Sequence, residues 1–206
     1  MLRIWGRMSS INVQKVTWCA EEAGIPYERI DAGREFGIVN TPEFLALNPN
    51  GLVPVIEDDG FVLWESNAIV RYLSAKYGAE GLYPADIASR ADADRWLDWS
   101  MFSLATAMHD AFWQLVRTEA PLRDRDRIAE AVAKTEKAAA ILDAHLEGKH
   151  YVAGKTFTIG DIGVGCVAHR WLGLPVQKER RRFLERYVDD LRDRKSAARI
   201  LTLPIV

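Results

Sequence analysis

The chain has 206 residues, of which 49% are hydrophobic and 27% are charged. This composition is that of a folded globular protein with room for one large domain or two small ones, and it argues against disorder. A formal net charge of −2 provides no overall attraction to nucleic acid or to an anionic membrane. No apolar run approaches a membrane span and the N-terminus lacks a signal-peptide core, so we expect a cytoplasmic protein with no nucleic-acid and no membrane partner.

The first third of the chain alternates strand and helix patterns. Residues 2–5 form a short apolar strand, a helix that begins near Asn12 is stopped by Gly24, and residues 27–31 form the next strand. A strand, a helix and a strand within roughly thirty residues make a βαβ unit, which predicts that these two strands are parallel. Both cysteines, Cys19 and Cys166, lie in apolar helical stretches without a CxxC pair, so we expect reduced core thiols.

A short helix over residues 42–47 leads to a predicted hairpin. Residues 53–56 and 61–64 are β-branched and aromatic, and the Asp59-Gly60 step between them is a strong turn signal. Pro54 cannot donate a ladder hydrogen bond, so its strand is either an edge strand or is interrupted there.

A helix is predicted to begin directly after the hairpin, at Glu65 or Ser66. Its first turn carries unpaired N–H groups and a partial positive charge, which favour an anionic group such as a carboxylate. The resulting element order is β-α-β-α-β-β-α.

Residues 79–87, rich in glycine and proline signals, are the predicted linker between a first domain, 1–78, and a second, 88–206. Residues 88–116 and 128–146 place apolar side chains at helical spacing, which predicts an all-helical second domain. Thr158 and Asp161 have the spacing of a capping box, so Asp161 is interpreted as a helix cap and not as a catalytic carboxylate. We also expect residues 178–182 to be a solvated helix face and residues 200–206 to be a packed tail.

Val53-Pro54, followed by Glu65-Ser66-x-Ala-Ile after an N-terminal strand and a polar loop, resembles the thioredoxin-like half of cytosolic glutathione transferases. The resemblance extends from Leu2 to about Gly173 and is to the bacterial, serine-type or theta-like members. It implies an α/β thioredoxin-like domain followed by a helical domain, glutathione as co-substrate, no metal, and a homodimer. It further implies that Pro54 follows a cis bond, that Val53 pairs with the cysteinyl backbone of glutathione, and that Glu65 and Ser66 hold its γ-glutamyl end.

The resemblance places a donor to the glutathione sulfur in the loop after the first strand. Ser10 matches the serine of the serine-type classes, Asn12 is a second candidate, and Ser9 is a third. A donor aimed at a thiolate lowers its pKa because it stabilises the charged form. For all three residues, helix capping is the structural alternative.

The other ligand contacts stay open at this stage. Arg34, Val39 and Asn40 compete to hold the glycine carboxylate of glutathione. A hydrophobic electrophilic substrate is expected between the domains, against the first long helix of the second domain, although an aromatic helix is more often core than pocket. The candidate residues for that pocket are Trp99, Phe102, His109 and Trp113.

The sequence thus predicts a glutathione transferase that activates the thiolate for conjugation or halide displacement. A glutathione-dependent isomerase or reductase on the same fold is one alternative, although a reductase needs a loop cysteine that this chain lacks. A non-catalytic binding or assembly module that kept the fold is the other.

Overall fold

The computed structural model describes residues 1–78 and 81–206, and the chain divides into two compact units, Met1–Ala85 and Asp86–Val206. The predicted linker begins at residues 79–80, which lie outside the described residues. Each unit is described by itself below.

The first unit has the predicted order β-α-β-α-β-β-α, with one added 3₁₀ turn. Its elements are β1 (Leu2–Trp5), α1 (Ile11–Glu22), β2 (Tyr27–Ile30), η1 (Arg34–Phe36), α2 (Pro42–Leu47), β3 (Val55–Asp58), β4 (Phe61–Trp64) and α3 (Ser66–Tyr77). The sheet order is β2-β1-β3-β4, in which β1 and β2 are parallel and the other pairs are antiparallel. Because β3 is an interior strand that begins at Val55, Pro54 precedes the strand; the alternative of an edge strand is wrong.

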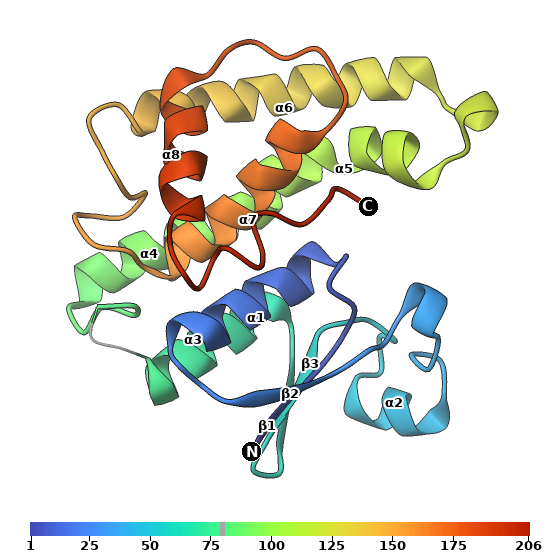
Figure 1. Cartoon of the computed structure of the whole chain (residues 1–206), viewed down its shortest axis with the longest axis vertical. Helices are drawn as coiled ribbons and strands as arrows, with labels where there is room; N and C mark the ends of the chain where they lie inside the picture. The colour runs from blue at the N-terminus through green and yellow to red at the C-terminus, as the bar shows by residue number, and fades with distance from the viewer. Residues whose placement is uncertain (79–80) are drawn as a thin grey trace. The chain divides into compact units, whose positions relative to one another are not determined.

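The two faces of the sheet carry different layers. Ile4 pairs with Ile56, and Trp5 pairs with Val55, so alternate residues point to opposite faces. Trp5 makes an edge-to-face contact with Phe44 of α2, at 6.1 Å between ring centroids. Ile4 and Ile56, both fully buried, therefore face the other layer, where α1 and α3 pack side by side (Figure 1).

The β3–β4 hairpin turns at Asp59 and Gly60, whose φ angles of 51° and 88° are both positive. Two positive φ angles define the type I′ turn that matches the twist of antiparallel strands, and an Asp-Gly pair tolerates them well. The turn signal in the sequence is thus confirmed.

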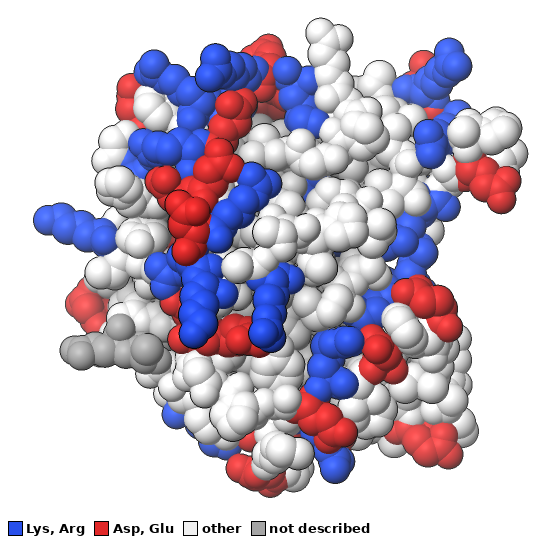
Figure 2. Space-filling model, viewed as in Figure 1, with Lys and Arg blue, Asp and Glu red and all other residues white. Residues whose placement is uncertain are grey.

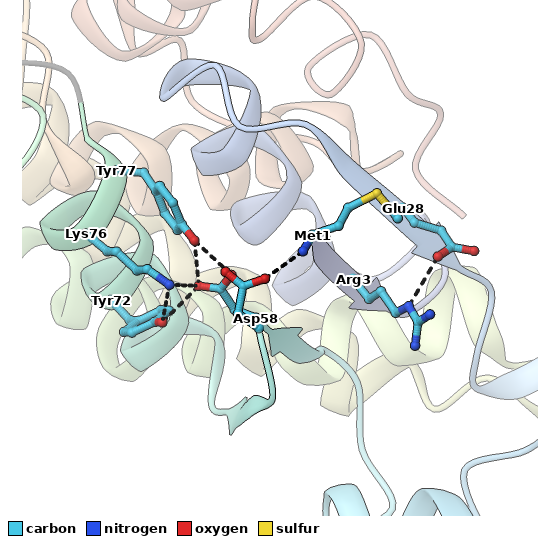
Figure 3. A network of polar contacts seen from close by, with 8 residues as sticks. Met1, Arg3, Glu28, Asp58, Tyr72, Lys76 and Tyr77 are labelled. Atoms are coloured by element: carbon cyan, nitrogen blue, oxygen red, sulfur yellow. Dashed lines mark hydrogen bonds and ion pairs between the residues drawn. The ribbon is translucent and has the colours of Figure 1, made fainter.

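A polar network ties the end of β3 to the last turns of α3 (Figure 3). Asp58 accepts hydrogen bonds from Tyr72 Oη at 2.8 Å, Lys76 Nζ at 2.8 Å and Tyr77 Oη at 2.8 Å. Burial by itself would raise the pKa of Asp58, but the bonds from Lys76, Tyr77 and Tyr72 outweigh it, so this pKa lies below its ordinary value. Asp58 is therefore ionised and fully hydrogen-bonded at neutral pH.

The second unit is all helical, as predicted. Its elements are α4 (Ile87–Trp99), the π-helical segment η2 (Ser100–Ala105), α5 (Thr106–Phe112), the π-helical segment η3 (Trp113–Arg117), the 3₁₀ turn η4 (Ala120–Leu122), α6 (Arg125–His145), α7 (Ile159–Gly173) and α8 (Arg182–Arg192). Residues 159–171 of α7 are all buried, and α7 packs against α4 and α8 (Figure 1). A side chain at Gly163 would lie 2.8 Å from Leu97 Cδ1, so close helix packing explains this glycine.

The capping box at the start of α7 is present as predicted. Thr158 Oγ1 accepts from the Gly160 N–H, and Asp161 accepts from the Thr158 N–H at 2.9 Å. Asp161 also accepts from the Val152 N–H and from Tyr187 Oη, both at 2.9 Å. Burial raises the pKa of Asp161 to about 6, and these hydrogen bonds oppose that rise. The residue is a structural cap that also fixes the 152 region and α8.

The expectation of a solvated helix face over residues 178–182 is wrong in part. α8 begins only at Arg182, and Arg181 lies ahead of it in an ion pair with Glu136 at 2.9 Å, with both side chains 18% exposed. Lys178 donates to the carbonyl groups of Leu174 and Val176 at the end of α7. Arg181 and Lys178 therefore stabilise the segment that connects α7 to α8. The charge pattern of the sequence does not reveal these partners.

Acidic and basic side chains alternate over the face that carries α8 (Figure 2). Several are paired, including Arg192 with Asp189 at 2.6 Å and Arg186 with Asp190 at 3.8 Å. No helix in the described part of the chain combines the length and the hydropathy needed to cross a membrane.

Candidate active site

The loop between β1 and α1 is held in place by backbone hydrogen bonds. The Gly6 N–H donates to the Ile30 carbonyl at 2.8 Å, and the Arg7 N–H donates to the Ala32 carbonyl at 3.2 Å. A side chain at Gly6, whose φ is 151°, would lie 2.4 Å from Val13 Cγ2. Glycine is therefore required there for the loop to approach α1 closely.

Ser10 occupies the N-cap position of α1 and is only 9% exposed. Its carbonyl accepts the Gln14 N–H at 2.9 Å, but its side chain makes no capping hydrogen bond. The helix therefore does not use the Ser10 hydroxyl, which remains available to a ligand. Ser9 lies half-buried in the loop just ahead of it.

The starts of α1 and α3 meet through a hydrogen bond from Ser66 Oγ to Asn12 Oδ1, at 3.2 Å. Ser66 is buried and is the first residue of α3, and the exposed Glu65 before it has a φ of 72°. A positive φ at a glutamate is an uncommon conformation, which the surrounding structure must stabilise. Because Ser66 donates to Oδ1, this bond leaves the amide NH₂ group of Asn12 uncommitted.

The Val53–Pro54 peptide bond is cis. Pro54 is buried, while Val53 packs with Val39 against the small core of Ala32, Phe44 and Val55. Val53 and Val39, which are distant in the sequence, are thereby brought together.

The two other candidates for the glycine carboxylate are exposed. Arg34 opens η1 with a φ of 53°. Asn40 lies close to Gly51, where an added side chain would stand 3.3 Å from Asn40 Oδ1 and 3.1 Å from the Val39 carbonyl. The loop before α2 thus approaches the segment that leads to Val53.

The four residues expected for the second substrate are spread along α4 to η3. Trp99 packs on Trp96 with ring centroids 5.2 Å apart, whereas Phe102 is 78% exposed on η2. His109 stacks on Trp113 at 5.9 Å, and Trp113 is 48% exposed on η3. Phe102 and Trp113 lie on π-helical segments, which occur frequently at functional sites.

Sequence reasoning missed two residues of the first unit that lie beside the candidate glutathione residues, Lys15 and Arg7. Lys15 of α1 is fully buried and donates to Asn67 Oδ1 at 2.7 Å, which adds a second bond between α1 and α3. Arg7, in the loop before Ser10, is half-buried and close to Arg34. A charged residue in a short loop of small and polar residues was the only local signal for Arg7. Among the described residues, no group of histidine, cysteine, aspartate and glutamate side chains could hold a metal ion.

Comparison with known proteins supports the arrangement across the whole chain. Residues 1–75 match the family model for the glutathione S-transferase N-terminal domain, and residues 125–194 match that for the C-terminal domain. The chain is 39% identical to glutathione S-transferase GstB of Escherichia coli (strain K12) over 207 aligned residues, which cover 100% of both proteins.

Solved structures agree with that assignment. A theta-class glutathione S-transferase of Xanthomonas axonopodis pv. citri, crystallised with glutathione bound, superposes with a TM-score of 0.95 at 42% identity, covering 100% of this chain and 99% of that one. Glutathione transferase F2 of Populus trichocarpa superposes with a TM-score of 0.88 at 26% identity, covering 98% and 97%. The chain therefore belongs to the glutathione S-transferase family.

Proposed function

We propose that this protein binds glutathione on its first unit, lowers the pKa of the glutathione thiol, and promotes attack of the thiolate on an electrophilic small molecule. The reaction is conjugation by addition or displacement of a leaving group such as halide. The observation that carries the proposal is the hydrogen bond between Ser66 and Asn12 beside the uncommitted hydroxyl of Ser10. The glutathione-bound relative supports the same substrate.

In this proposal, the Ser10 hydroxyl donates a hydrogen bond to the sulfur of glutathione and keeps its proton. Stabilising the anion lowers the thiol pKa from about 8.5 toward neutrality, so no general base is needed. The N-terminus of α1 adds a partial positive charge, typically worth about 0.3–1 kcal/mol. Asn12 offers its amide NH₂ group as a second donor, and Ser9 remains a third candidate.

The N-terminus of α3 is proposed to hold the γ-glutamyl carboxylate. Its unpaired N–H groups point out of the first turn, the Ser66 hydroxyl lies there, and the exposed Glu65 carboxylate suits the α-amino group. The backbone of Val53 supplies one N–H and one carbonyl for pairing with an extended peptide.

The remaining assignments rest on family resemblance together with local features. We propose that Trp99, Phe102, His109 and Trp113 contact a hydrophobic electrophile, because Phe102 and Trp113 expose large apolar surface. A second copy of the chain is the proposed partner, because the family forms homodimers by resemblance. Reduced thiols at Cys19 and Cys166 suit the cytoplasm.

A disulfide reductase is disfavoured by the state of Cys19. Its thiol is buried, contacts Ser74 Oγ at 3.2 Å, and has its pKa raised to about 12 by burial. Such a thiol stays protonated and cannot act as a nucleophile at neutral pH.

The test of the proposed function is a binding measurement followed by a turnover assay. Calorimetry should detect glutathione binding, and an aromatic halide should then be conjugated in a glutathione-dependent reaction that the protein accelerates. Binding without turnover toward aromatic halides, halogenated acids, epoxides and unsaturated carbonyls would favour the non-catalytic module. The absence of both would contradict the proposal outright.

A further inference from the structure

Gln14 is a buried amide on α1, one helical turn after Ser10. The residue is only 5% exposed. Its backbone N–H donates to the Ser10 carbonyl at 2.9 Å, and its side-chain Nε2 donates to the Met8 carbonyl at 2.8 Å. Two donors of one residue therefore hold both ends of the loop segment over residues 8–10.

The side-chain bond of Gln14 runs backwards over six residues, from the helix into the loop ahead of it. Helix capping does not account for this bond, because capping side chains bond to the N–H groups of the first turn, whereas Gln14 donates to a loop carbonyl. A buried amide is unfavourable unless it is hydrogen-bonded. The bond therefore stabilises the loop conformation in which the Met8 carbonyl turns toward α1.

The beginning of the same loop is held from the sheet. Arg29 of β2 donates through Nη1 to the Gly6 carbonyl at 2.8 Å. Between the two ends, the Ser10 N–H donates to the Arg7 carbonyl at 3.1 Å, which closes a turn over residues 7–10. Arg29 thus fixes the start of the loop, and Gln14 fixes its end.

The position of the Ser10 hydroxyl depends on this backbone. The hydroxyl makes no capping hydrogen bond, so no N–H group of α1 fixes it. With the carbonyl groups of Met8 and Ser10 both bound to Gln14, the Cα–Cβ bond of Ser10 has one direction, and only χ1 rotation remains. Loss of the bond to Met8 would free residues 8–10 to turn, and the hydroxyl would turn with them.

We propose that Gln14 is a positioning residue for the thiolate donor, because it holds the loop so that the Ser10 hydroxyl is directed at the glutathione sulfur. The inference rests on the proposed function, in which Ser10 is that donor. Gln14 acts through Ser10 and supplies no charge of its own. A hydrogen bond weakens steeply as its donor turns away from the acceptor, so a small rotation of the loop raises the thiol pKa.

The first measurement is the pKa of the bound thiol, followed through thiolate absorbance against pH in the glutathione complex. Gln14→Met keeps the length of the side chain but cannot donate. It should raise this pKa by about 0.5–1 pH unit, a part of the effect of losing one hydrogen bond to a charged group. Gln14→Asn, whose amide is one methylene too short to reach Met8, should shift the pKa in the same direction.

The affinity for glutathione separates positioning from a general loss of the site. At a pH where the bound thiol is protonated in every variant, Gln14→Met should keep the wild-type Kd, because Ser66 and Val53 are unchanged. Thr17→Val is the matched control, since Thr17 is a fully buried residue of α1 whose hydroxyl donates to carbonyl groups within the helix and not to the loop. It should leave the thiol pKa unchanged.

A double-mutant cycle shows whether Gln14 acts through Ser10. In a Ser10→Ala background, Gln14→Met should cause no further rise in the thiol pKa. An equal rise in both backgrounds, or no rise in either Gln14 variant, would overturn the positioning role with the proposed function intact. Wild-type protein that binds no glutathione, or leaves its thiol pKa at the free value, would overturn both. Melting curves establish that each variant compared is folded.

Discussion

One hydrogen bond joins two residues that are 54 positions apart, Ser66 and Asn12, at the starts of two helices. Replacing Ser66 by alanine removes the hydroxyl that makes this bond, whose single proton turns to the γ-glutamyl carboxylate in the proposed complex with glutathione. We expect Ser66→Ala to weaken glutathione binding by about 1–2 kcal/mol, or roughly five- to thirtyfold in Kd, because a hydrogen bond to a charged ligand group is lost. Isothermal titration calorimetry measures this change.

Ser74→Ala is the matched control, since Ser74 lies on the same helix eight residues later and contacts Cys19 instead. Its affinity for glutathione should equal that of the wild type. If Ser66→Ala also binds like the wild type, the γ-glutamyl group is not held at the start of α3.

The identity of the thiolate donor is decided by three single substitutions. Ser10→Ala should raise the pKa of the bound thiol, because the hydroxyl that stabilises the thiolate is gone. Absorbance of the thiolate, recorded against pH for the glutathione complex, follows this pKa. A shift caused by Asn12→Ala or Ser9→Ala, with Ser10→Ala unchanged, would transfer the role to that residue.

At the scale of elements, the hairpin of β3 and β4 is fastened to α3 through Asp58. The side chain of Asp58 is 1% exposed and accepts from Tyr72, Lys76 and Tyr77 (Figure 3). Its pKa is lowered in the folded protein, so its contribution to stability is present above the ordinary value near 3.8 and is lost as the pH falls through the lowered pKa.

Asp58→Asn should therefore reduce the free energy of unfolding by about 1–3 kcal/mol at pH 7, because three donors lose a charged acceptor. The deficit should be constant from pH 7 to pH 5 and shrink below about pH 4, where the unfolded wild-type chain takes up a proton at Asp58 that the folded chain, with its lowered pKa, does not yet bind. Urea unfolding at several pH values measures it. Asp59→Asn, at an exposed neighbour, is the control, and a deficit in Asp58→Asn that persists undiminished at pH 3 would contradict this account.

The long helical stretch from α4 to η3 departs from the regular helix that its apolar periodicity predicts. The predicted stripe is largely buried, with Ala93, Leu97, Leu104 and Ala111 each at 0% exposure. The two π-helical segments within it do not follow from that pattern, because the same apolar spacing serves a regular helix equally well. A π-helical turn contains one residue more in each hydrogen-bonded ring than an α-helical turn. Helix packing in the second unit decides where these turns occur.

At the scale of the whole molecule, the C-terminal residues are fastened to the helical unit. Ile200 and Leu201 are buried, and the Arg117 guanidinium donates to the Val206 carbonyl at 2.7 Å. His169 of α7 contacts the Leu203 carbonyl through Nε2 at 3.1 Å. The predicted packed tail is thus confirmed.

The partners of His169 determine its protonation. Arg192 can only donate, so His169 Nδ1, 3.2 Å from its guanidinium, accepts, and Nε2–H donates to the Leu203 carbonyl. The imidazole is therefore neutral. Burial lowers the pKa of His169 below 6.5, the hydrogen bond to the Leu203 carbonyl opposes this, and the charges of Arg192 and Arg170 add to the lowering.

A neutral buried histidine makes stability depend on pH. Below pH 6.5 the unfolded chain gains a proton that the folded chain resists, so the free energy of unfolding should decrease from pH 7 to pH 5. The slope from one such group is at most about 1.4 kcal/mol per pH unit. His169→Gln, which cannot titrate, should reduce the slope measured by urea unfolding.

His150→Gln, at a histidine whose side chain is 80% exposed, is the control substitution. Some slope should remain in His169→Gln because burial also lowers the pKa of His145. Identical slopes for wild type and His169→Gln would show that His169 is not a neutral anchor of the tail.

Much of the fold could be predicted because its signals are local. The Asp59-Gly60 turn, the Thr158 and Asp161 cap and the helix start at Ser66 each depend on atoms within about four residues of one another. Such signals act through dihedral preferences and short-range hydrogen bonds. The same kind of local signal led to the candidates Ser10 and Ser66, since each stands at a helix start, and their roles toward glutathione stay predictions.

The sequence by itself determined the order of elements, the two-part architecture and the helix starts where an anionic ligand is expected. Only the tertiary structure decided that Ser66 reaches Asn12, that Arg29 reaches the Gly6 carbonyl, and that Arg181 pairs with Glu136. These contacts join segments that no local rule relates, because chain crossings and side-chain packing bring them together. The positions of charges and hydrogen-bond donors at a site depend on that packing. Only the tertiary structure therefore places the side chains that the proposed chemistry needs.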